Sequence, residues 1–287
     1  MAQDYIEHHK KMNSTQNRLQ GYLGAKPYYD AELSQILQYV NKNLPVLEIG
    51  SGFGYLAKYL TEYNAYGGGG FKDISCVDTS KGLLEEIKNW VNPCPNLYNK
   101  DGLEFLQNIK NKYGLIIMYD VFEHFPLEKA VELAKVCYEA LDKDGMLVIR
   151  TPNMANILGI YSKYIDVTHY YCYTQHSLTQ ILNEAGFEDN AINVWEPKWK
   201  IGSMHYKNKL KNDEIHKKLF ALHDRVQPLT FDKNLLMSAS KTPKNIVSID
   251  LSKPKFKLFG KTKIADKRII HFFGIKFSYK KSKKTDL

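Results

Sequence analysis

The sequence predicts a doubly wound α/β fold, in which helices cover both faces of a mostly parallel β-sheet. The first observation is an alternation of segments: amphipathic helical patterns separate short apolar runs that begin near residues 46, 72, 96, 115 and 145. Strands that alternate with helices in this way form βαβ units with parallel strands. The second observation is that acidic residues end several of these runs, where an open parallel sheet binds its ligands. With 287 residues, of which 44% are apolar, the chain can bury one large core and carry a small appendage.

The first apolar run leads into a glycine-rich turn. Residues 46–54 have the sequence VLEIGSGFG, with glycine at every second position, and a helical pattern begins at Tyr55. Glycine tolerates positive φ angles and lets a ligand lie against bare backbone, while the start of a helix offers unpaired N–H groups. A dinucleotide-binding loop would have the spacing G-x-G-x-x-G and needs no acid inside the strand, whereas this segment has E-x-G-x-G-x-G. An ordinary glycine-rich turn without a ligand is the alternative.

Two further acids follow the next two strands. Phe71–Asp78 predicts a strand that ends in Asp78, whose carboxylate can accept both hydrogen bonds of a ribose diol. Asp101 follows a short strand at Asn96–Asn99. Each acid taken alone is equally well explained as a loop residue or a helix cap. The glycine run at 67–70 predicts a flexible insertion before the second strand.

The fourth apolar run carries the largest group of candidate functional residues. Leu115–Tyr119 predicts a buried strand, and the segment Asp120–Pro126, DVFEHFP, follows it. Pro126 suits the first turn of a helix, because its missing N–H would be unpaired there. That helix is expected to end near Asp142, before another buried strand at Met146–Arg150. The acid that ends the fourth strand and the Glu-His pair after it are therefore expected at the same sheet edge as the glycine turn.

In this order, the glycine motif, the later acids and the D-V-x-E-H segment resemble the class I S-adenosylmethionine (SAM) methyltransferases. The resemblance covers roughly residues 28–241 and implies a Rossmann-like, mostly parallel seven-stranded sheet with an antiparallel last strand. Asn190–Trp195 and Asn234–Ser240 would be the last two strands, paired as an antiparallel hairpin at the sheet edge. Further helices are expected at Gln175–Ala185 and at residues 212–225.

The resemblance also implies the cofactor and the residues that bind it. SAM is the expected cofactor, with Asp78 on its ribose and Asp101 on its adenine amino group. The residues expected to contact SAM are Glu48, Gly50, Ser51, Gly52, Gly54, Asp78, Thr79, Asp101, Gly102, Tyr119 and Asp120. The sulfonium of SAM is already a good leaving group, so catalysis depends mainly on holding donor and acceptor close together and in line.

Three residues are candidates for taking the proton of an acceptor hydroxyl: His169, His124 and Glu123. Histidine titrates near neutral pH and acts as a general base without a large shift of its pKa. His169 lies in the segment YIDVTHYY, after the fifth strand, where the acceptor should be covered. A set of Asp120, Glu123, His124 and His169 instead resembles the divalent-metal site of ubiquinone-biosynthesis and small-RNA methyltransferases. Those proteins have Glu where this chain has the shorter Asp120, so a metal is not favoured, and purely structural roles are the third alternative.

The expected function is O-methylation of a small polar acceptor. The motifs D-V-x-E-H, T-P-N and D-V-T-H resemble methyltransferases of sugars or of activated precursors of bacterial surface polysaccharides, so the partner would be a sugar, a nucleotide sugar or a sugar phosphate. A quinone-like phenol or another secondary metabolite is the alternative acceptor. Methylation of a nucleic-acid base is disfavoured, because the fourth strand ends in D-V-F-E and not in an N/D-P-P-aromatic sequence. An inactive SAM-binding scaffold or sensor is the alternative outside enzymes, and the intact glycine motif argues against it.

The predicted division of the chain is an N-terminal helical extension, a methyltransferase domain with inserted segments that cover the substrate, and a small basic β appendage. Their residues are 1–27, 28–241 (with covering segments near 153–174 and 196–233) and 242–287, respectively. Within the first part of the domain, Asp30 is expected to cap a new helix at Ala31–Lys42.

Charge is distributed unevenly along the chain. The net charge is +9, yet residues 242–287 alone hold 13 Lys and Arg against three Asp, so the preceding part is close to neutral. Apolar and aromatic residues alternate with the basic ones, which a purely disordered tail would not have. The tail is therefore either a solvated appendage or a contact to an anionic membrane or an acidic carrier, and nucleic acid is not expected as a partner.

The rest of the composition indicates a cytoplasmic enzyme. No apolar run approaches the roughly 18–20 residues that span a membrane, and the first residues lack the apolar core of a signal peptide. The cysteines have no C-x-x-C pair and are expected to be reduced; they are Cys76, Cys94, Cys137 and Cys172. The basic tail would allow a peripheral location at the inner face of the membrane.

Overall fold

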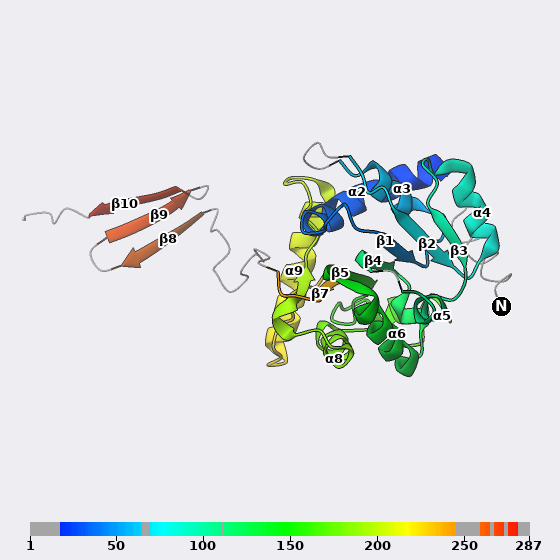
Figure 1. Ribbon diagram of the computed structural model, residues 1–287. Coiled ribbons are helices and arrows are strands. Elements are labelled where there is room, and N and C mark those ends of the chain that lie inside the picture. Colours follow the sequence, from blue (N-terminus) through cyan, green and yellow to red (C-terminus); the bar gives the residue numbers. More distant parts are fainter. Residues whose placement is uncertain are drawn as a thin grey trace, which may run out of the picture. The chain divides into compact units, whose positions relative to one another are not determined.

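The computed structural model describes residues 18–64, 69–110 and 112–244, together with the backbone of residues 259–264, 267–272 and 275–280 (Figure 1). The chain divides into two compact units, Met1–Asn245 and Ile246–Leu287. Most of the predicted N-terminal extension, residues 1–17, lies outside the described residues. The same is true of residues 65–68, which include the first half of the predicted glycine insertion.

The first unit is built on a seven-stranded sheet with the strand order β3-β2-β1-β4-β5-β7-β6. The strands are β1 (Val46–Ile49), β2 (Ile74–Asp78), β3 (Asn96–Asn99), β4 (Tyr113–Tyr119), β5 (Leu141–Pro152), β6 (Ile192–Trp195) and β7 (Asn234–Ser240). Neighbouring strands from β3 to β5 are parallel, and only β7 runs antiparallel to its neighbours β5 and β6. This confirms the predicted fold class. The chain moves outward from β1 to β3 and then returns to β4, so the edge between β1 and β4 is the switch point where such sheets bind ligands.

Helices cover both faces of this sheet, as expected for a doubly wound fold. They are α2 (Arg18–Leu37), α3 (Tyr55–Glu62), α4 (Lys81–Trp90), α5 (Gly102–Gln107), α6 (Leu127–Ala140), α7 (Gly159–Tyr164), α8 (Gln175–Ala185) and α9 (Met204–Leu222), with short helical turns η2 (Phe122–His124) and η3 (Asp189–Ala191). α2 packs with α3, α6 packs with α5 and α8, and Figure 1 shows these two groups on opposite sides of the sheet. The central strands β1 and β4 are buried along almost their whole length, so their apolar side chains fill the core on both faces.

The N-terminal helix differs from the prediction. α2 runs without a break through the expected boundary, so Asp30 is an interior residue and not the cap of a new helix. Pro27 removes one backbone donor from this helix. However, Tyr22 before the proline and Leu33 after it are both buried. Tertiary packing on both sides of the proline therefore keeps the two halves in one helix.

Other element boundaries shift by a few residues. α6 ends at Ala140 rather than near residue 142, because β5 begins immediately after it and pairs with β4 from that point. α9 begins at Met204, earlier than predicted, where the hydroxyl of Ser203 caps its first turn. α8 agrees with the prediction at both ends, since Thr174 caps its start and Gly186 follows its end with a φ of 112°.

The second unit contains three antiparallel strands in the order β10-β9-β8. They are β8 (Phe259–Ile264), β9 (Lys267–Phe272) and β10 (Ile275–Lys280). These strands lie in the segment that the alternation of apolar and basic residues predicted as a β appendage.

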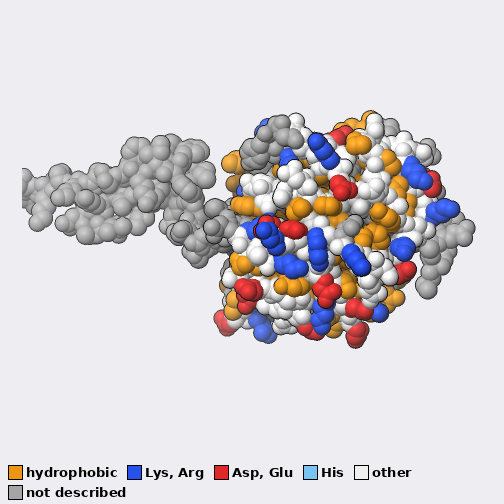
Figure 2. Space-filling model, in the orientation of Figure 1, with side chains coloured by type: hydrophobic (Ala, Val, Ile, Leu, Met, Phe, Trp, Pro, Cys, Tyr) orange, Lys and Arg blue, Asp and Glu red, His pale blue; other side chains and the backbone are white. Residues whose placement is uncertain are grey.

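The described surface of the first unit is chemically mixed. Figure 2 shows one face on which hydrophobic side chains are exposed between Lys and Arg side chains. Among the residues that the structure describes, no helix is both long enough and apolar enough to cross a lipid bilayer.

Candidate active site

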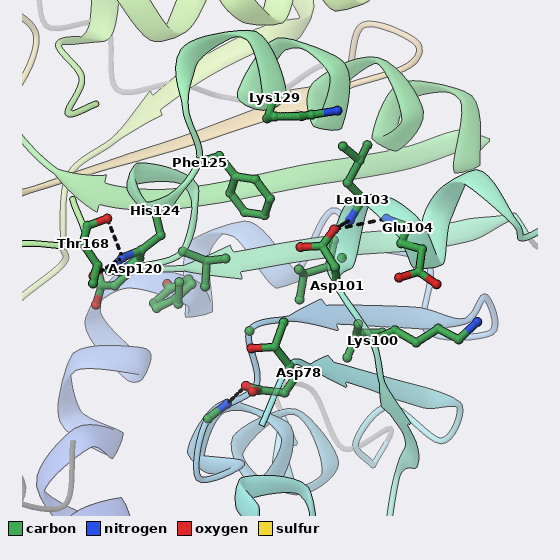
Figure 3. A pocket seen from close by; sticks show the side chains of 18 of the residues that line it. Asp78, Lys100, Asp101, Leu103, Glu104, Asp120, His124, Phe125, Lys129 and Thr168 are labelled. Atoms are coloured by element: carbon green, nitrogen blue, oxygen red, sulfur yellow. Dashed lines mark hydrogen bonds between the residues drawn. The ribbon is translucent and has the colours of Figure 1, made fainter. Parts of the chain in front are cut away.

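A cavity of about 910 Å³ lies at the carboxyl ends of β1, β2 and β4, at the switch point of the sheet. One part of its wall contains Asp78 and Asp101, and another part contains His124 and Thr168 (Figure 3). The residues predicted to contact SAM that do line this cavity are Gly50, Gly52, Asp78, Thr79, Asp101, Gly102, Tyr119 and Asp120. They come together because parallel strands end at the same edge of the sheet.

Two glycines of the turn after β1 have different roles. Gly50 has a φ of 72°, and a Cβ atom there would lie 2.3 Å from Cγ2 of Val121, so the packing of the two loops requires glycine. Gly52 has a φ of 50°, but a Cβ atom there would meet no heavy atom within 4 Å. Because Gly52 lines the cavity, the open space beside its backbone is part of the candidate ligand site.

The two acids hold the loops that form this part of the wall. Asp78 accepts hydrogen bonds from the backbone N–H groups of Gly52 at 2.9 Å and of Ser80 at 2.8 Å. This carboxylate therefore ties the glycine turn to the start of α4. Asp101 accepts from two N–H groups in the first turn of α5 and caps that helix. Both acids also line the cavity, so their structural role is compatible with contact to a ligand.

Asp120 lines the cavity, and the negative charge of its carboxylate is paired with a neighbouring arginine. It has a φ of 55°, which is unusual for a residue other than glycine. Its carboxylate accepts two hydrogen bonds from the guanidinium of Arg150, which also donates to Glu32 of α2 at 3.2 Å. Although burial lowers the pKa of Arg150, Asp120 and Glu32 together raise it above its usual range. The carboxylate of Asp120 is therefore engaged by Arg150.

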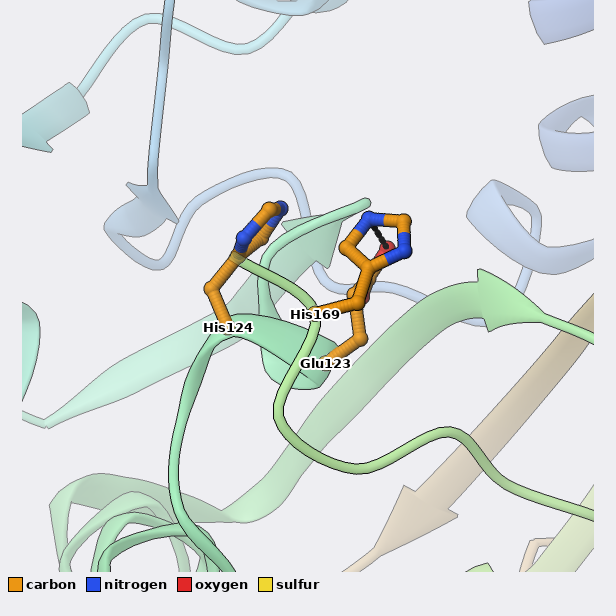
Figure 4. Close-up of side chains that lie close together, drawn as sticks. All are labelled: Glu123, His124 and His169. Atoms are coloured by element: carbon orange, nitrogen blue, oxygen red, sulfur yellow. Dashed lines mark ion pairs between the residues drawn. The ribbon is translucent and has the colours of Figure 1, made fainter. Parts of the chain in front are cut away.

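The side chains of Glu123, His124 and His169 lie close together, as Figure 4 shows. One potential ligand atom of each lies within 4.8 Å of the other two. The centroids of the two imidazole rings are 4.8 Å apart, and Nε2 of His169 lies 4.0 Å from Oε1 of Glu123. Glu123 is completely buried, and this burial raises the pKa of its carboxyl. Of the three, His124 is the one that lines the cavity.

The hydrogen bonds of the two histidines assign their tautomers. Nδ1 of His124 lies 2.8 Å from the hydroxyl of Thr168, and that hydroxyl donates its own hydrogen to Asp166 at 2.6 Å. The hydroxyl therefore accepts from His124, so that Nδ1 carries the hydrogen and Nε2 holds the basic lone pair. His169 is held similarly, with Nδ1 2.9 Å from the carbonyl oxygen of Ser162. Burial and the neighbouring His169 lower the pKa of His124, which keeps this ring uncharged at neutral pH.

Residues 22–192 match the family model of a methyltransferase domain. The chain belongs to this methyltransferase family. The matched region includes the glycine turn, both acids of the cavity wall and the Glu123–His124 pair. The protein is accordingly a SAM-dependent methyltransferase of class I, as the glycine motif predicted. The family match identifies the class of reaction and leaves the acceptor to be inferred from the site.

The relatives found by sequence similarity are named polyamine aminopropyltransferases. The methyltransferase is 28% identical over 206 residues to a polyamine aminopropyltransferase of Clostridium perfringens, a match that covers 64% of this chain and 70% of the relative. A polyamine aminopropyltransferase of Alkaliphilus metalliredigens is 31% identical over 120 residues, but this match covers only 38% of the chain and 40% of that relative.

Solved structures show the same fold. A SAM-dependent methyltransferase from Archaeoglobus fulgidus has a TM-score of 0.54 at 19% identity, and the match covers 82% of this chain and 98% of that one. The plantazolicin methyltransferase BamL has a TM-score of 0.50 at 11% identity, with 84% and 91% of the two chains covered. At these identities the likeness establishes the architecture alone.

Three residues predicted to contact SAM are not on the cavity wall: Glu48, Ser51 and Gly54. Glu48 lies inside β1, and its carboxyl accepts a weak hydrogen bond from the thiol of Cys76 at 3.7 Å. Ser51 is buried, and a Cβ atom at Gly54 would lie 2.8 Å from the side chain of Ile87 in α4. Glu48 and Ser51 of the methyltransferase are thus buried, and Gly54 packs against α4. All three support the turn on the side away from the cavity, and their contact with the cofactor stays a prediction.

The buried carboxyl of Glu48 predicts a pH dependence of stability. Burial raises its pKa from 4.5 to about 8. The native protein therefore holds this proton more tightly than the unfolded chain, and the free energy of unfolding decreases as the pH rises from about 4.5 to about 8. Glu48→Gln keeps the shape of the protonated carboxyl and should remove part of this decrease. At a pH near 8.5, the variant should be more stable than the wild type by roughly 1–3 kcal/mol.

Urea unfolding on the acidic and on the alkaline side of this range measures the effect. Glu85, which pairs with Lys88 on the surface of α4, supplies the control variant Glu85→Gln. The control should follow the wild type at both pH values. If Glu48→Gln also follows the wild type, the pKa of Glu48 in the native protein is not raised.

Sequence reasoning missed Thr168 and Arg150, which determine the properties of the cavity wall. Thr168 fixes the tautomer of His124 although 44 residues separate them, and Arg150 compensates Asp120 from the neighbouring strand. A local signal existed for Thr168: Asp166 precedes it by two residues and accepts from both its N–H and its hydroxyl, a common short-range pattern. Arg150 had no such signal, because its partners come from distant parts of the chain.

Proposed function

We propose that this methyltransferase transfers the methyl group of SAM to a hydroxyl of a small polar acceptor, with His124 as the general base. The observation that carries the proposal is the hydrogen-bonded series of Asp166, Thr168 and His124 at the cavity wall. It supports an uncharged imidazole with Nε2 as its basic atom. A hydroxyl acceptor needs such a group to take its proton while the new bond forms. The ring of His169 packs against the ring of His124, and His169 in turn lies 4.0 Å from Glu123. His169 and Glu123 therefore help to position the imidazole of His124.

The donor site in this proposal is the part of the cavity formed by the glycine turn and the two acids. The backbone at Gly52 offers the nucleoside a surface without a side chain, Asp78 accepts from the ribose hydroxyls, and Asp101 accepts from the adenine amino group. The other donor-site residues are Gly50, Thr79, Gly102 and Tyr119. The methyl group then points toward the histidine wall, where in-line transfer requires the acceptor oxygen at about 3 Å.

The acceptor end of the cavity favours a compound that presents a hydroxyl group. Its wall combines apolar and hydroxyl-bearing side chains from Phe125, Pro126, Thr168 and Tyr170. The nearby carboxylate of Asp120 is compensated by Arg150. Aromatic faces with hydroxyl tips suit sugars, which supports a sugar, a nucleotide sugar or a sugar phosphate on the route to a bacterial surface polysaccharide. A phenol fits the same wall and is the alternative acceptor.

A divalent ion is the competing way to activate the same hydroxyl. Glu123, His124 and His169 fit such an ion, since their ligand atoms lie within 4.8 Å of one another and neither oxygen of the buried Glu123 has a hydrogen-bond partner. A bound ion would lower the pKa of the acceptor hydroxyl. Asp120, the fourth residue of that hypothesis, is engaged by Arg150 instead, which weakens the four-residue site and supports the general-base proposal.

Aminopropyl transfer to a polyamine is a second candidate, supported by the names of the curated relatives. A polyamine carries several positive charges, and a site that buries them needs carboxylates to pair with them. At the acceptor end of this cavity, the carboxylate of Asp120 is already paired, and the neighbouring wall is aromatic or hydroxyl-bearing. Methyl transfer to a hydroxyl therefore fits the site better.

Turnover with two donors distinguishes these reactions. With SAM and a panel of nucleotide sugars, sugar phosphates and phenols, we expect S-adenosylhomocysteine to form together with a methyl ether, detected by mass spectrometry. With decarboxylated SAM and putrescine, we expect no aminopropylated product. Aminopropyl transfer in the second assay, without methylation of any hydroxyl in the first, would overturn the proposal.

A further inference from the structure

The segment between β5 and α8 exposes many apolar side chains, and we call these side chains the 157–171 surface. They reach exposed fractions of 73% at Tyr164 and 98% at Val167. Its members are Ile157, Leu158, Ile160, Tyr161, Tyr164, Ile165, Val167, Tyr170 and Tyr171. Monomeric proteins in water rarely leave so many large apolar residues of one short segment exposed, so such a surface indicates an interaction site.

The charged side chains of this segment are bound within it. The ammonium of Lys163 donates to the carbonyl oxygens of His169 and Tyr170. The carboxylate of Asp166 accepts from the N–H and the hydroxyl of Thr168. These hydrogen bonds already satisfy part of the hydrogen-bonding capacity of the two charged groups, which lowers the cost of bringing the 157–171 surface to an apolar boundary. Its tyrosines combine an apolar ring with a polar tip, as side chains at a membrane–water boundary do.

The 157–171 surface adjoins the acceptor end of the cavity. Thr168 and Tyr170 line the cavity, and the backbone N–H of Tyr170 donates to the carbonyl oxygen of Glu123 at 2.8 Å. The same short segment thus forms part of the cavity wall and carries the exposed apolar side chains. Whatever covers the 157–171 surface also approaches the acceptor.

The charge of the chain indicates which partner covers the 157–171 surface. Residues 242–287 hold 13 Lys and Arg against three Asp, while the rest of the chain is nearly neutral. A second copy of the chain would bring a second basic tail, and the two would repel each other. An anionic bilayer satisfies both features at once, because its headgroups attract the basic tail and its interface accepts apolar and tyrosine side chains.

We propose that the 157–171 surface inserts into the interface of an anionic membrane, to which the basic tail adds electrostatic attraction. This brings the acceptor end of the cavity to the bilayer. Only that consequence for the acceptor rests on the proposed function; the membrane contact itself does not. A single apolar or basic signal gives weak, reversible attachment, and the two together give stable attachment.

Vesicle flotation with the full-length protein tests this proposal. We expect the wild type to float with phosphatidylcholine vesicles that contain roughly one third phosphatidylglycerol and to stay in solution with phosphatidylcholine alone, with binding that weakens as salt is added. The double variant Ile160→Asp, Tyr164→Asp should bind at least tenfold more weakly. Its matched control is Ile201→Asp, Met204→Asp, which changes two apolar residues outside the 157–171 surface that are at least as exposed on average, and which should bind like the wild type.

A second variant separates the contribution of the tail. Replacing Lys280, Lys281, Lys283 and Lys284 with Gln should reduce binding and its salt dependence together. All variants should keep the thermal midpoint and the SAM affinity of the wild type, which excludes misfolding as the cause. Wild-type affinity for vesicles in the Ile160→Asp, Tyr164→Asp variant would overturn the proposal. So would a wild-type dimer in light scattering that this variant dissociates, because the occupant would then be a second copy. Neither measurement needs a methyl acceptor, so failure of the proposed function leaves this test intact.

Discussion

Gly52→Val should weaken SAM binding about 100-fold or more, the equivalent of roughly 2.7 kcal/mol. A Cβ atom at Gly52 meets no protein atom within 4 Å, so the valine side chain would project into the cavity, where the nucleoside is expected to lie against the backbone. The positive φ of 50° adds a modest cost to the folded state. Titration calorimetry with SAM and with S-adenosylhomocysteine measures the loss.

A matched variant separates the steric effect from the backbone effect. Gly202 precedes α9, has a φ of 84°, and also has open space around the position of a Cβ atom, but it does not line the cavity. Gly202→Val should therefore carry a similar conformational cost and keep the SAM affinity of the wild type. Asp78→Ala should lose affinity as well, because it removes the group that holds the N–H of Gly52. Undiminished SAM affinity in both Gly52→Val and Asp78→Ala would contradict the assignment of the donor site.

The donor half of the site could be predicted because its signals are local. Asp78 is the last residue of β2, Gly52 lies in the turn after β1, and Asp101 lies in the turn after β3. The alternation of strands and helices brings these strand ends to one edge of the sheet. The turn itself shows the limit of this reasoning. Glu48 belongs to the same motif, yet its side chain lies inside the sheet against Cys76. The sequence spacing identifies a turn that binds a ligand, but the direction of each side chain depends on its neighbours in the sheet.

The acceptor half could be predicted only in part, because its contacts join distant segments. Glu123, His124 and His169 were the candidates for taking the proton of the acceptor, and in the structure they lie close to one another. The position of His124 on the wall depends on Thr168, and the compensation of Asp120 depends on Arg150. Such pairings arise when β4, β5 and the loop after β5 pack side by side. No sequence pattern within any one of these segments predicts them.

The same limit applies to the first helix. Asp30 is a good helix cap, and Pro27 is a poor interior residue, so local propensity favours a new helix after them. The structure instead has one helix, because Tyr22 and Leu33 are both buried. Where burial on two sides of a weak point is possible, packing outweighs the local preference.

His124→Ala should lower kcat about 10²–10⁴-fold, the range typical for loss of a general base. SAM affinity should stay close to that of the wild type, because the change lies at the acceptor end of the cavity. The pKa of His124 is lowered by burial and by His169, so kcat/KM of the wild type should rise with pH through one group below the ordinary histidine value of 6.5 and then level off. The control His176→Ala removes an exposed histidine of α8 and should be indistinguishable from the wild type.

Thr168→Val tests how the base is positioned. The variant removes the hydroxyl that accepts from Nδ1 of His124 and keeps the size of the side chain. The backbone carbonyl oxygen of residue 168, 3.2 Å from Nδ1, remains as an acceptor, so the imidazole keeps its tautomer but loses the closer of these two hydrogen-bond partners. We expect a smaller loss of kcat than in His124→Ala, together with a shift of the pH profile that a merely structural change would not cause.

A metal site predicts a different pattern: chelation would stop turnover, Mg²⁺ or Mn²⁺ would restore it, and Glu123→Ala and His169→Ala would be as damaging as His124→Ala. If turnover survives both chelation and His124→Ala within a few-fold of the wild type, neither a base nor a metal acts at this wall, and positioning of the two substrates accounts for the rate.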